Sequence, residues 1–157
     1  MSLGQQLNTL LAHETECLLQ LLDILGQEHA ALLAGDIDGI EHATAIKNEA
    51  LASQAQVTGS RQHLVSLSSF DNSEAGLQQL IAHCENSEQI GDAYARLNAL
   101  ALQCRAGNRT NGRLIMQRQE QARGALNVIR QTGSATPTYS GQGKTMAAQA
   151  TRSLGKA

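Results

Sequence analysis

Histidine and cysteine are the side chains of this sequence best suited to bind a metal ion, and histidine can also transfer a proton. His13 and Cys17 are four residues apart, so a helix would place them on one face. Such a pair supplies only two of the four ligands that a zinc site requires. The histidines are His13, His29, His42, His63 and His83. We expect them on partly exposed helix faces, and we predict neither a metal site nor a cofactor.

Glu14 and Glu28 are the other candidates for chemistry, because they interrupt an otherwise apolar column of residues spaced by seven. That column is Leu7, Glu14, Leu21 and Glu28. A carboxylate desolvated between helices can serve as a general acid or base. We favour the alternative, in which both carboxylates lie at the edge of the helix interface and pair with arginines of a later, basic helix. The sequence has no nucleophile elbow, P-loop or dinucleotide fingerprint, so we predict that the protein is not an enzyme.

The composition indicates an all-α fold. Phe70, Tyr94 and Tyr139 are the only aromatic residues, which leaves an aliphatic core that suits helix packing better than a β-sandwich. Pro137 is the only proline, so nothing before it interrupts a helix by removing a backbone donor. At 157 residues the chain has the length of one domain with a tail.

Charge is distributed unevenly along the chain. Residues 1–50 contain eight acids and one lysine, whereas residues 96–130 contain seven arginines and one glutamate. A basic helix can bind nucleic acid, but the stacking aromatics that accompany RNA surfaces are missing here. We therefore expect the acidic and basic helices to attract each other within one bundle, with no nucleic-acid partner. The start of the chain has no signal-peptide pattern and no apolar run reaches membrane-spanning length, so we expect a cytoplasmic protein without membrane insertion and with reduced cysteines.

Three long helices and one short helix follow from the spacing of apolar residues. Columns spaced by seven run from Leu3 to Leu33 and make a stripe wide enough for two neighbours. Gly35 and Asp36 then suit a helix end and a helix start, so the next helix, about 37–67, should return antiparallel to the first. Its expected interface columns are Ala43, Ala50, Val57, Leu64 and Ile46, Ser53, Ser60, Leu67.

The later part of the chain predicts a loop over 68–73, a short helix containing Leu77, and a long helix over about 88–131. Asn108 and Asn111 fall on the apolar columns of that long helix, where polar residues fix register at a cost in stability. Gly107 and Gly112 lie beside them and would allow a close helix approach or a kink, although we expect a continuous helix. Together these elements predict an antiparallel bundle with coiled-coil-like packing over residues 1–131 and a flexible C-terminal tail over 132–157.

Several of these features together resemble the FlgN family of flagellar export chaperones. The most specific is the block Asn108-x-x-Asn111-Gly112-x-Leu114-Ile115. Others are the turn at Asp36 followed by Lys47-x-x-x-Leu51, and Thr138-Tyr139-x-Gly141-x-Gly143 in the tail. The family commonly has glycine directly after the tyrosine, where this chain has Ser140.

The resemblance implies a cytosolic chaperone that binds the hook-associated proteins of the hook–filament junction and prevents their premature polymerisation. It implies delivery of these proteins to the type III export gate, with Tyr139 as the contact to the gate. Candidate cargo contacts are the apolar residues Leu114, Ile115, Leu126, Val128 and Ile129. For Asn108, Asn111 and Gly112 we favour a structural role in helix register.

Two alternatives stay open at the level of sequence. The first is a coiled-coil adaptor that binds helices without a role in secretion, in which the apolar residues near Ile129 belong to an ordinary bundle core. The second concerns assembly, because wide apolar stripes suit both a monomeric bundle and helix exchange in a homo-oligomer.

Overall fold

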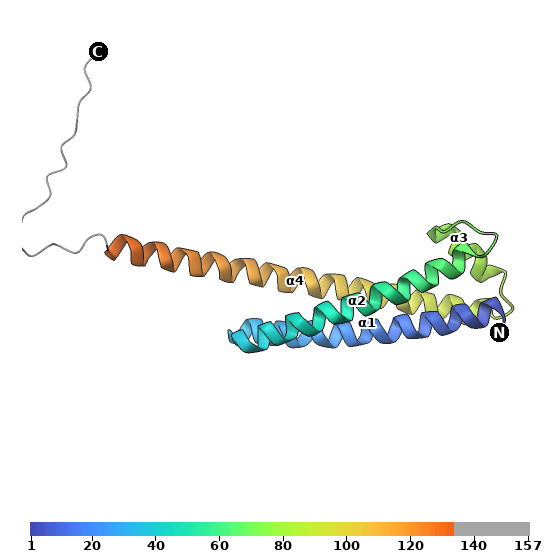
Figure 1. The fold of residues 1–157 in the computed structure, drawn as a ribbon, viewed down its shortest axis with the longest axis horizontal. Coiled ribbons are helices and arrows are strands. Elements are labelled where there is room, and N and C mark those ends of the chain that lie inside the picture. The colour runs from blue at the N-terminus through green and yellow to red at the C-terminus, as the bar shows by residue number, and fades with distance from the viewer. Residues whose placement is uncertain (134–157) are drawn as a thin grey trace, which may run out of the picture. The chain divides into compact units, whose positions relative to one another are not determined.

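The computed structural model of the chain describes residues 1–133, which form four helices joined by short connections (Figure 1). The helices are α1 (Leu3–Ala34), α2 (Ile37–Ser66), α3 (Glu74–Ala82) and α4 (Ser87–Gly133), and residues 1–133 contain no strand. This confirms the predicted all-α bundle of three long helices and one short one. The chain divides into two compact units, Met1–Ile115 and the residues from Met116 onward. The tail predicted over 132–157 lies outside the described residues, except for Thr132 and Gly133, which end α4.

Local capping explains where the helices begin and end. Ser2 and Gln5 form a capping box at the start of α1, in which the Ser2 hydroxyl accepts from the Gln5 amide and the Gln5 side chain accepts from the Ser2 amide. Gly35 ends α1 in the left-handed conformation, with φ 69°. Asp36 caps α2 by accepting a 3.1 Å hydrogen bond from the Gly39 amide. The predicted turn is therefore confirmed, and α1 and α2 lie side by side as a helical hairpin (Figure 1).

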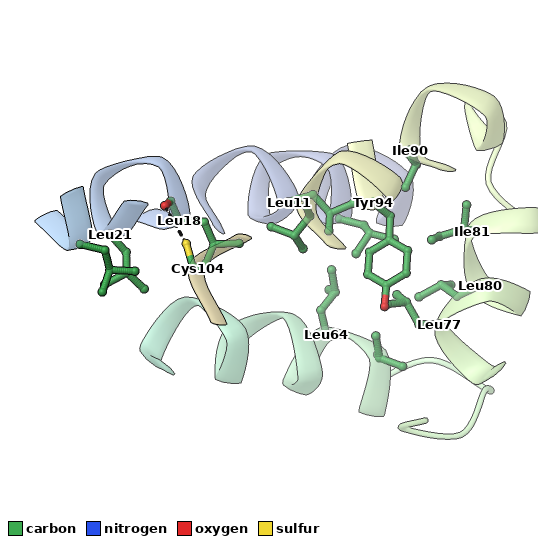
Figure 2. Packing of buried hydrophobic residues seen from close by; sticks show 14 residues of the cluster. Leu11, Leu18, Leu21, Leu64, Leu77, Leu80, Ile81, Ile90, Tyr94 and Cys104 are labelled. Atoms are coloured by element: carbon green, nitrogen blue, oxygen red, sulfur yellow. Dashed lines mark hydrogen bonds between the residues drawn. The ribbon is translucent and has the colours of Figure 1, made fainter. Parts of the chain in front are cut away.

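The core of the first unit is almost entirely aliphatic. It gathers leucines of α1 with Leu64 and Val65 of α2, the apolar face of α3, and Ile90 and Leu97 of α4. Figure 2 shows the Tyr94 ring of α4 pointing toward α3, where its hydroxyl donates to the Glu74 carboxylate. Each well-buried aliphatic side chain contributes about 1.5–3 kcal/mol, so this apolar contact is the main source of stability.

The expected interface of α2 was only half correct. Ala43, Val57 and Leu64 are buried as predicted, whereas Ser53 and Leu67 of the second predicted column are exposed. A different column points inward in its place, and it contains Lys47, Gln54 and Arg61. The reason is that α2 presents long polar side chains to α1, whose buried carboxylates they reach.

The last helix, α4, runs without interruption through both Gly107 and Gly112, as predicted. Its columns are buried at Ile90, Leu97, Cys104 and Asn111, but all residues from Met116 to Gly133 are exposed. Asn108, which was expected on the buried interface, is also exposed. The buried part of α4 therefore ends near the boundary between the two units.

Candidate functional site

A buried polar cluster joins three helices around Glu28, whose side chain is 0% exposed. The Lys47 ammonium of α2 donates to Glu28 Oε1 over 2.6 Å, and Asn111 Nδ2 of α4 donates to Glu28 Oε2 over 2.9 Å. Asn111 Nδ2 also donates to the Leu25 carbonyl at 2.9 Å, and Asn111 Oδ1 lies 3.0 Å from His29 Nδ1. Since an amide oxygen can only accept, His29 must carry its proton on Nδ1. Both oxygens of the buried carboxylate are thus satisfied, as a buried charge requires.

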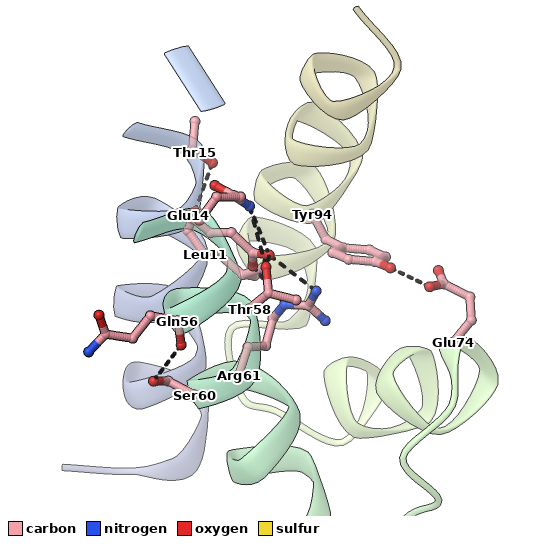
Figure 3. A network of polar contacts seen from close by, with 10 residues as sticks. Leu11, Glu14, Thr15, Gln56, Thr58, Ser60, Arg61, Glu74 and Tyr94 are labelled. Carbon is pink, nitrogen blue, oxygen red and sulfur yellow. Dashed lines mark hydrogen bonds and ion pairs between the residues drawn. The ribbon is translucent and has the colours of Figure 1, made fainter. Parts of the chain in front are cut away.

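A second cluster surrounds Glu14 of α1, which is 3% exposed (Figure 3). The Arg61 guanidinium of α2 donates from Nε to Glu14 Oε2 over 2.7 Å and from Nη2 to Oε1 over 3.3 Å. Thr58 adds a 2.6 Å hydrogen bond to Oε1, and Gln54 Nε2 a longer one of 3.4 Å. Arg61 thus contacts both carboxylate oxygens of Glu14, and such bidentate pairs are among the stronger ion pairs. The arginine also lies 5.9 Å from the centre of the Tyr94 ring, within reach of a cation–π contact.

These clusters correct the prediction for Glu14 and Glu28. Both carboxylates are buried, not at the edge of the interface, and within residues 1–133 their ion-pair partners belong to α2, not to the arginines of α4. The sequence did hold a signal for the partners, because Lys47 and Arg61 are the only basic residues before Arg96. The two glutamates are two heptads apart, and so are Lys47 and Arg61. The earlier glutamate pairs with the later base, which is the order that an antiparallel hairpin produces.

The residues of the Asn-x-x-Asn-Gly block lie in different surroundings. Asn111 is 2% exposed and holds three polar groups of α1. Asn108 lies at the rim of a groove, and a Cβ added to Gly112 would meet no atom within 4 Å. No helix of the described residues approaches Gly112 closely, which corrects the expectation for this glycine, whereas a Cβ added to Gly107 would contact Leu25 of α1 at 3.6 Å. Of the three, Asn111 is the residue with the contacts that fix how α4 aligns with α1.

A groove of about 360 Å³ runs between α2 and α4 within the first unit, and we call it the α2–α4 groove. Leu18, Leu21 and Leu25 of α1 line its floor. Lys47 and Arg61 stand on the α2 side, with Leu51, Gln54 and Thr58 between them. The α4 side is formed by Leu97, Asn98, Ala101, Cys104, Arg105 and Asn108. The columns expected to face inward on α2 did not predict this groove.

An exposed apolar stripe lies on the part of α4 that follows Ile115, and we define it by Ala122, Leu126 and Ile129. Ala122 and Ile129 continue the heptad column of Tyr94, and Leu126 lies one turn before Ile129. The stripe therefore follows one face of this part of the helix. Val128 is equally exposed but points about 100° away from Ile129 around the helix.

The other predicted contact residues differ in their surroundings. Leu114 and Ile115 are half-buried at the end of the first unit. Tyr139 lies outside the described residues. Of the five candidate cargo residues, Leu126 and Ile129 are the exposed ones that share a helix face.

The histidines and cysteines form no common centre. No group of three potential metal ligands occurs within residues 1–133. The three cysteines are free thiols, and burial raises the pKa of each of them: Cys17, Cys84 and Cys104. For Cys17 the charge of Glu16 adds to that increase. These thiols behave as small apolar side chains at neutral pH.

Comparison with known proteins adds a decisive observation to this architecture. The family model described as FlgN protein matches residues 1–147 of the chain. The chain belongs to the FlgN family. Neither the comparison with curated proteins nor the comparison with solved structures finds a match.

Membership of the FlgN family supports a general role as a chaperone in flagellar export. No helix within residues 1–133 is long and apolar enough to cross a bilayer. The described residues of this FlgN protein include two surface features, the apolar stripe on α4 and the α2–α4 groove.

Proposed function

We propose that this FlgN protein binds the hook-associated proteins of the hook–filament junction in the cytosol and prevents their premature polymerisation. In the same proposal it delivers them to the type III export gate, and Tyr139 contacts that gate. The family supports the chaperone role in general, and the residues support the more specific steps. The proposed function involves no bond-making chemistry.

The observation on which the proposal rests is the exposure of the apolar stripe. Leu126 and Ile129 are 55% and 66% exposed on a regular helix, next to the small side chain of Ala122. Apolar residues at helical spacing on a solvent-facing helix are the pattern by which one amphipathic helix binds another. The terminal helical segments through which filament-forming proteins associate would match such a surface.

The magnitude of the contact suits a carrier that must release its cargo. Burial of one aliphatic side chain contributes about 1.5–3 kcal/mol, and association costs several kcal/mol of that gain. Two or three anchors together would therefore give affinities of about micromolar. Binding at this level permits transfer to the export gate without a nucleotide-driven step.

A pair of neighbouring residues provides a matched test of the cargo surface. Ile129 belongs to the stripe, whereas Val128 has a similar exposure of 61% but faces another direction. We expect Ile129→Ser to weaken the binding of purified hook-associated proteins about tenfold or more, because it removes one anchor. Val128→Ser should change the affinity less than about threefold, as measured by isothermal titration calorimetry.

Two results of this titration would contradict the proposal. If the full chain binds none of the hook-associated proteins, the chaperone function fails, and the adaptor without a role in secretion becomes the better interpretation. If Val128→Ser and Ile129→Ser weaken binding equally, cargo does not recognise the stripe.

The gate contact is tested separately through Tyr139. We expect Tyr139→Ala to weaken binding to the export gate and to leave cargo affinity unchanged, because the tyrosine lies outside the proposed cargo surface. Tyr139→Phe is the control that retains the ring. Equal loss of gate and cargo binding in Tyr139→Ala would contradict the assignment.

A further inference from the structure

The α2–α4 groove is long enough to lie along one face of a short helix. Its α2 side extends from Lys47 to Arg61, which corresponds to about 21 Å along the helix axis. A helix of about 14 residues spans that distance. The leucines of the floor are buried beneath the two sides, so an apolar helix face would complete the contact between α1, α2 and α4.

The polar side chains around the groove leave it with one net positive charge, that of Arg105. Lys47, Arg61 and Arg105 line it, and the acids that neutralise them are Glu14 and Glu28. Within residues 1–133 Arg105 has no ion-pair partner. Lys47 uses one of its three N–H donors and Arg61 two of its five in the hydrogen bonds described, so donors remain for further carboxylates.

The α2 side of the groove also contains a buried polar atom without a partner in the described residues. Gln54 lies between Lys47 and Arg61 on the α2 side, and its Oε1 is buried without a hydrogen-bond partner in the described part of the chain. Buried polar atoms are rarely left unsatisfied in native proteins.

Charge argues against a segment of this chain as the occupant. Residues 116–133 carry three arginines and one glutamate, and residues 134–157 carry three basic residues and no acid. Either segment, from the same chain or from a second copy, would bring positive charge to a positive groove. Bringing like charges together weakens binding, whereas acidic groups placed at the rim would strengthen it.

We propose that the α2–α4 groove binds an acidic amphipathic helix of another protein. The helix is about three to four turns long, with an apolar face toward Leu18 and Leu21 and with carboxylates toward Lys47, Arg61 and Arg105. This site is separate from the apolar stripe of α4. FlgN thus has a second surface for a partner, which the proposed cargo contact does not use.

Two labelled peptides test the proposal on the full chain by fluorescence anisotropy. One is an amphipathic helix of about 14 residues with a leucine face and flanking glutamates, and the other has lysine in place of each glutamate. We expect the glutamate peptide to bind at least about tenfold more tightly than the lysine peptide at about 50 mM salt. That difference should shrink at about 500 mM salt, because ions screen the rim charges. Equal affinity of the two peptides would overturn the proposal.

Two arginines of α4 provide a matched pair of variants. Arg105 lines the groove, and Arg96 lies nine residues earlier, about 180° away around the helix. Both side chains are exposed, and both charge reversals change the net charge equally. Arg105→Glu should weaken the binding of the glutamate peptide about three- to tenfold, whereas Arg96→Glu should weaken it less than about twofold. Equal effects would show that the peptide senses only overall charge, which contradicts a site in the groove.

A third variant fills the groove, and a fourth separates this inference from the cargo proposal. Ala101→Phe should abolish peptide binding while the helical circular-dichroism spectrum is retained, because the ring occupies the space between the walls. Ile129→Ser should leave peptide binding unchanged, so loss of cargo in that variant and loss of the peptide in Arg105→Glu are distinct failures. If Ile129→Ser removes peptide binding, the peptide binds to the stripe and not to the groove, and the proposal is overturned. Light scattering tests whether a second copy occupies the groove. If the wild type forms a dimer and Arg105→Glu abolishes it, a second copy is the occupant, and the proposal is overturned.

Discussion

The buried pair of Lys47 and Glu28 allows a quantitative test of what holds the hairpin together. Lys47→Met retains the aliphatic stem of the side chain but removes the ammonium that lies 2.6 Å from Glu28 Oε1. The carboxylate is 0% exposed, so water cannot replace the lost cation. Removing one partner of a buried pair typically costs about 3–5 kcal/mol. We expect about 3 kcal/mol here, because Asn111 still donates to Oε2.

The assay is urea unfolding followed by circular dichroism. A loss of about 3 kcal/mol lowers the unfolding midpoint by about 1–3 M for a small protein. Arg96→Met is the control at an exposed position of α4, where we expect a change within about 0.5 kcal/mol. Removal of both partners in Glu28→Met with Lys47→Met should recover at least half of the loss, because no unpaired charge then remains.

Two results would refute this reasoning. If Lys47→Met costs no more than the Arg96→Met control, the ion pair contributes nothing that water or a shift of the helices cannot replace. If the double variant is less stable than Lys47→Met alone, the loss comes from packing around these side chains and not from an uncompensated carboxylate.

Three further predictions follow from the described contacts. Gly76→Ala should destabilise the protein by more than about 1 kcal/mol in the same unfolding assay, because the added Cβ would collide with a backbone carbonyl of the preceding loop. Gly91→Ala is the control and should stabilise the protein by about 0.5–1 kcal/mol, because a Cβ at Gly91 meets no other atom. Burial, aided by the hydrogen bond to a carboxylate of α3, raises the pKa of Tyr94 above its ordinary value of 10.0. The folded state therefore holds the phenol proton more tightly than the unfolded state. This contribution to the free energy of unfolding is complete below pH 10 and is lost as the pH rises through the folded-state pKa. Unfolding measured over that pH range should show a smaller loss of stability for Tyr94→Phe than for the wild type. Iodoacetamide should alkylate Cys84, which is half-buried, before Cys104, which is 5% exposed, and mass spectrometry of quenched samples gives the order.

The helices of the first unit were predictable where the sequence signal was redundant. The leucines of α1 repeat in columns spaced by seven, and any two of these columns predict the same buried face. Gly35 and Asp36 each specify the hairpin turn by a local mechanism, the left-handed conformation and the side-chain cap. Local rules were sufficient for these features because each depends on only a few neighbouring residues.

The interior of α2 was not predictable in the same way. Its alanines and serines leave neighbouring columns almost equal in hydrophobicity, so the pattern does not decide which one faces α1. The choice is made by Lys47 and Arg61, which reach Glu28 and Glu14 only when the hairpin has formed. The same long-range pairing leaves the α2–α4 groove open, and this is why the sequence alone predicted neither the partners of the carboxylates nor the groove.

The contacts of Asn111 bear on how α4 aligns with α1. A 47-residue helix with a nearly continuous apolar column can align with α1 in registers that differ by seven residues. Asn111 discriminates between them, because its amide bonds to Leu25, Glu28 and His29 within one turn of α1. In a register shifted by one heptad, Cys104 or Arg118 would face Glu28, and a thiol is too weak a donor while a second cation would lie beside Lys47. We infer that the polar cluster lowers stability relative to an apolar contact but holds α4 in this one register against α1.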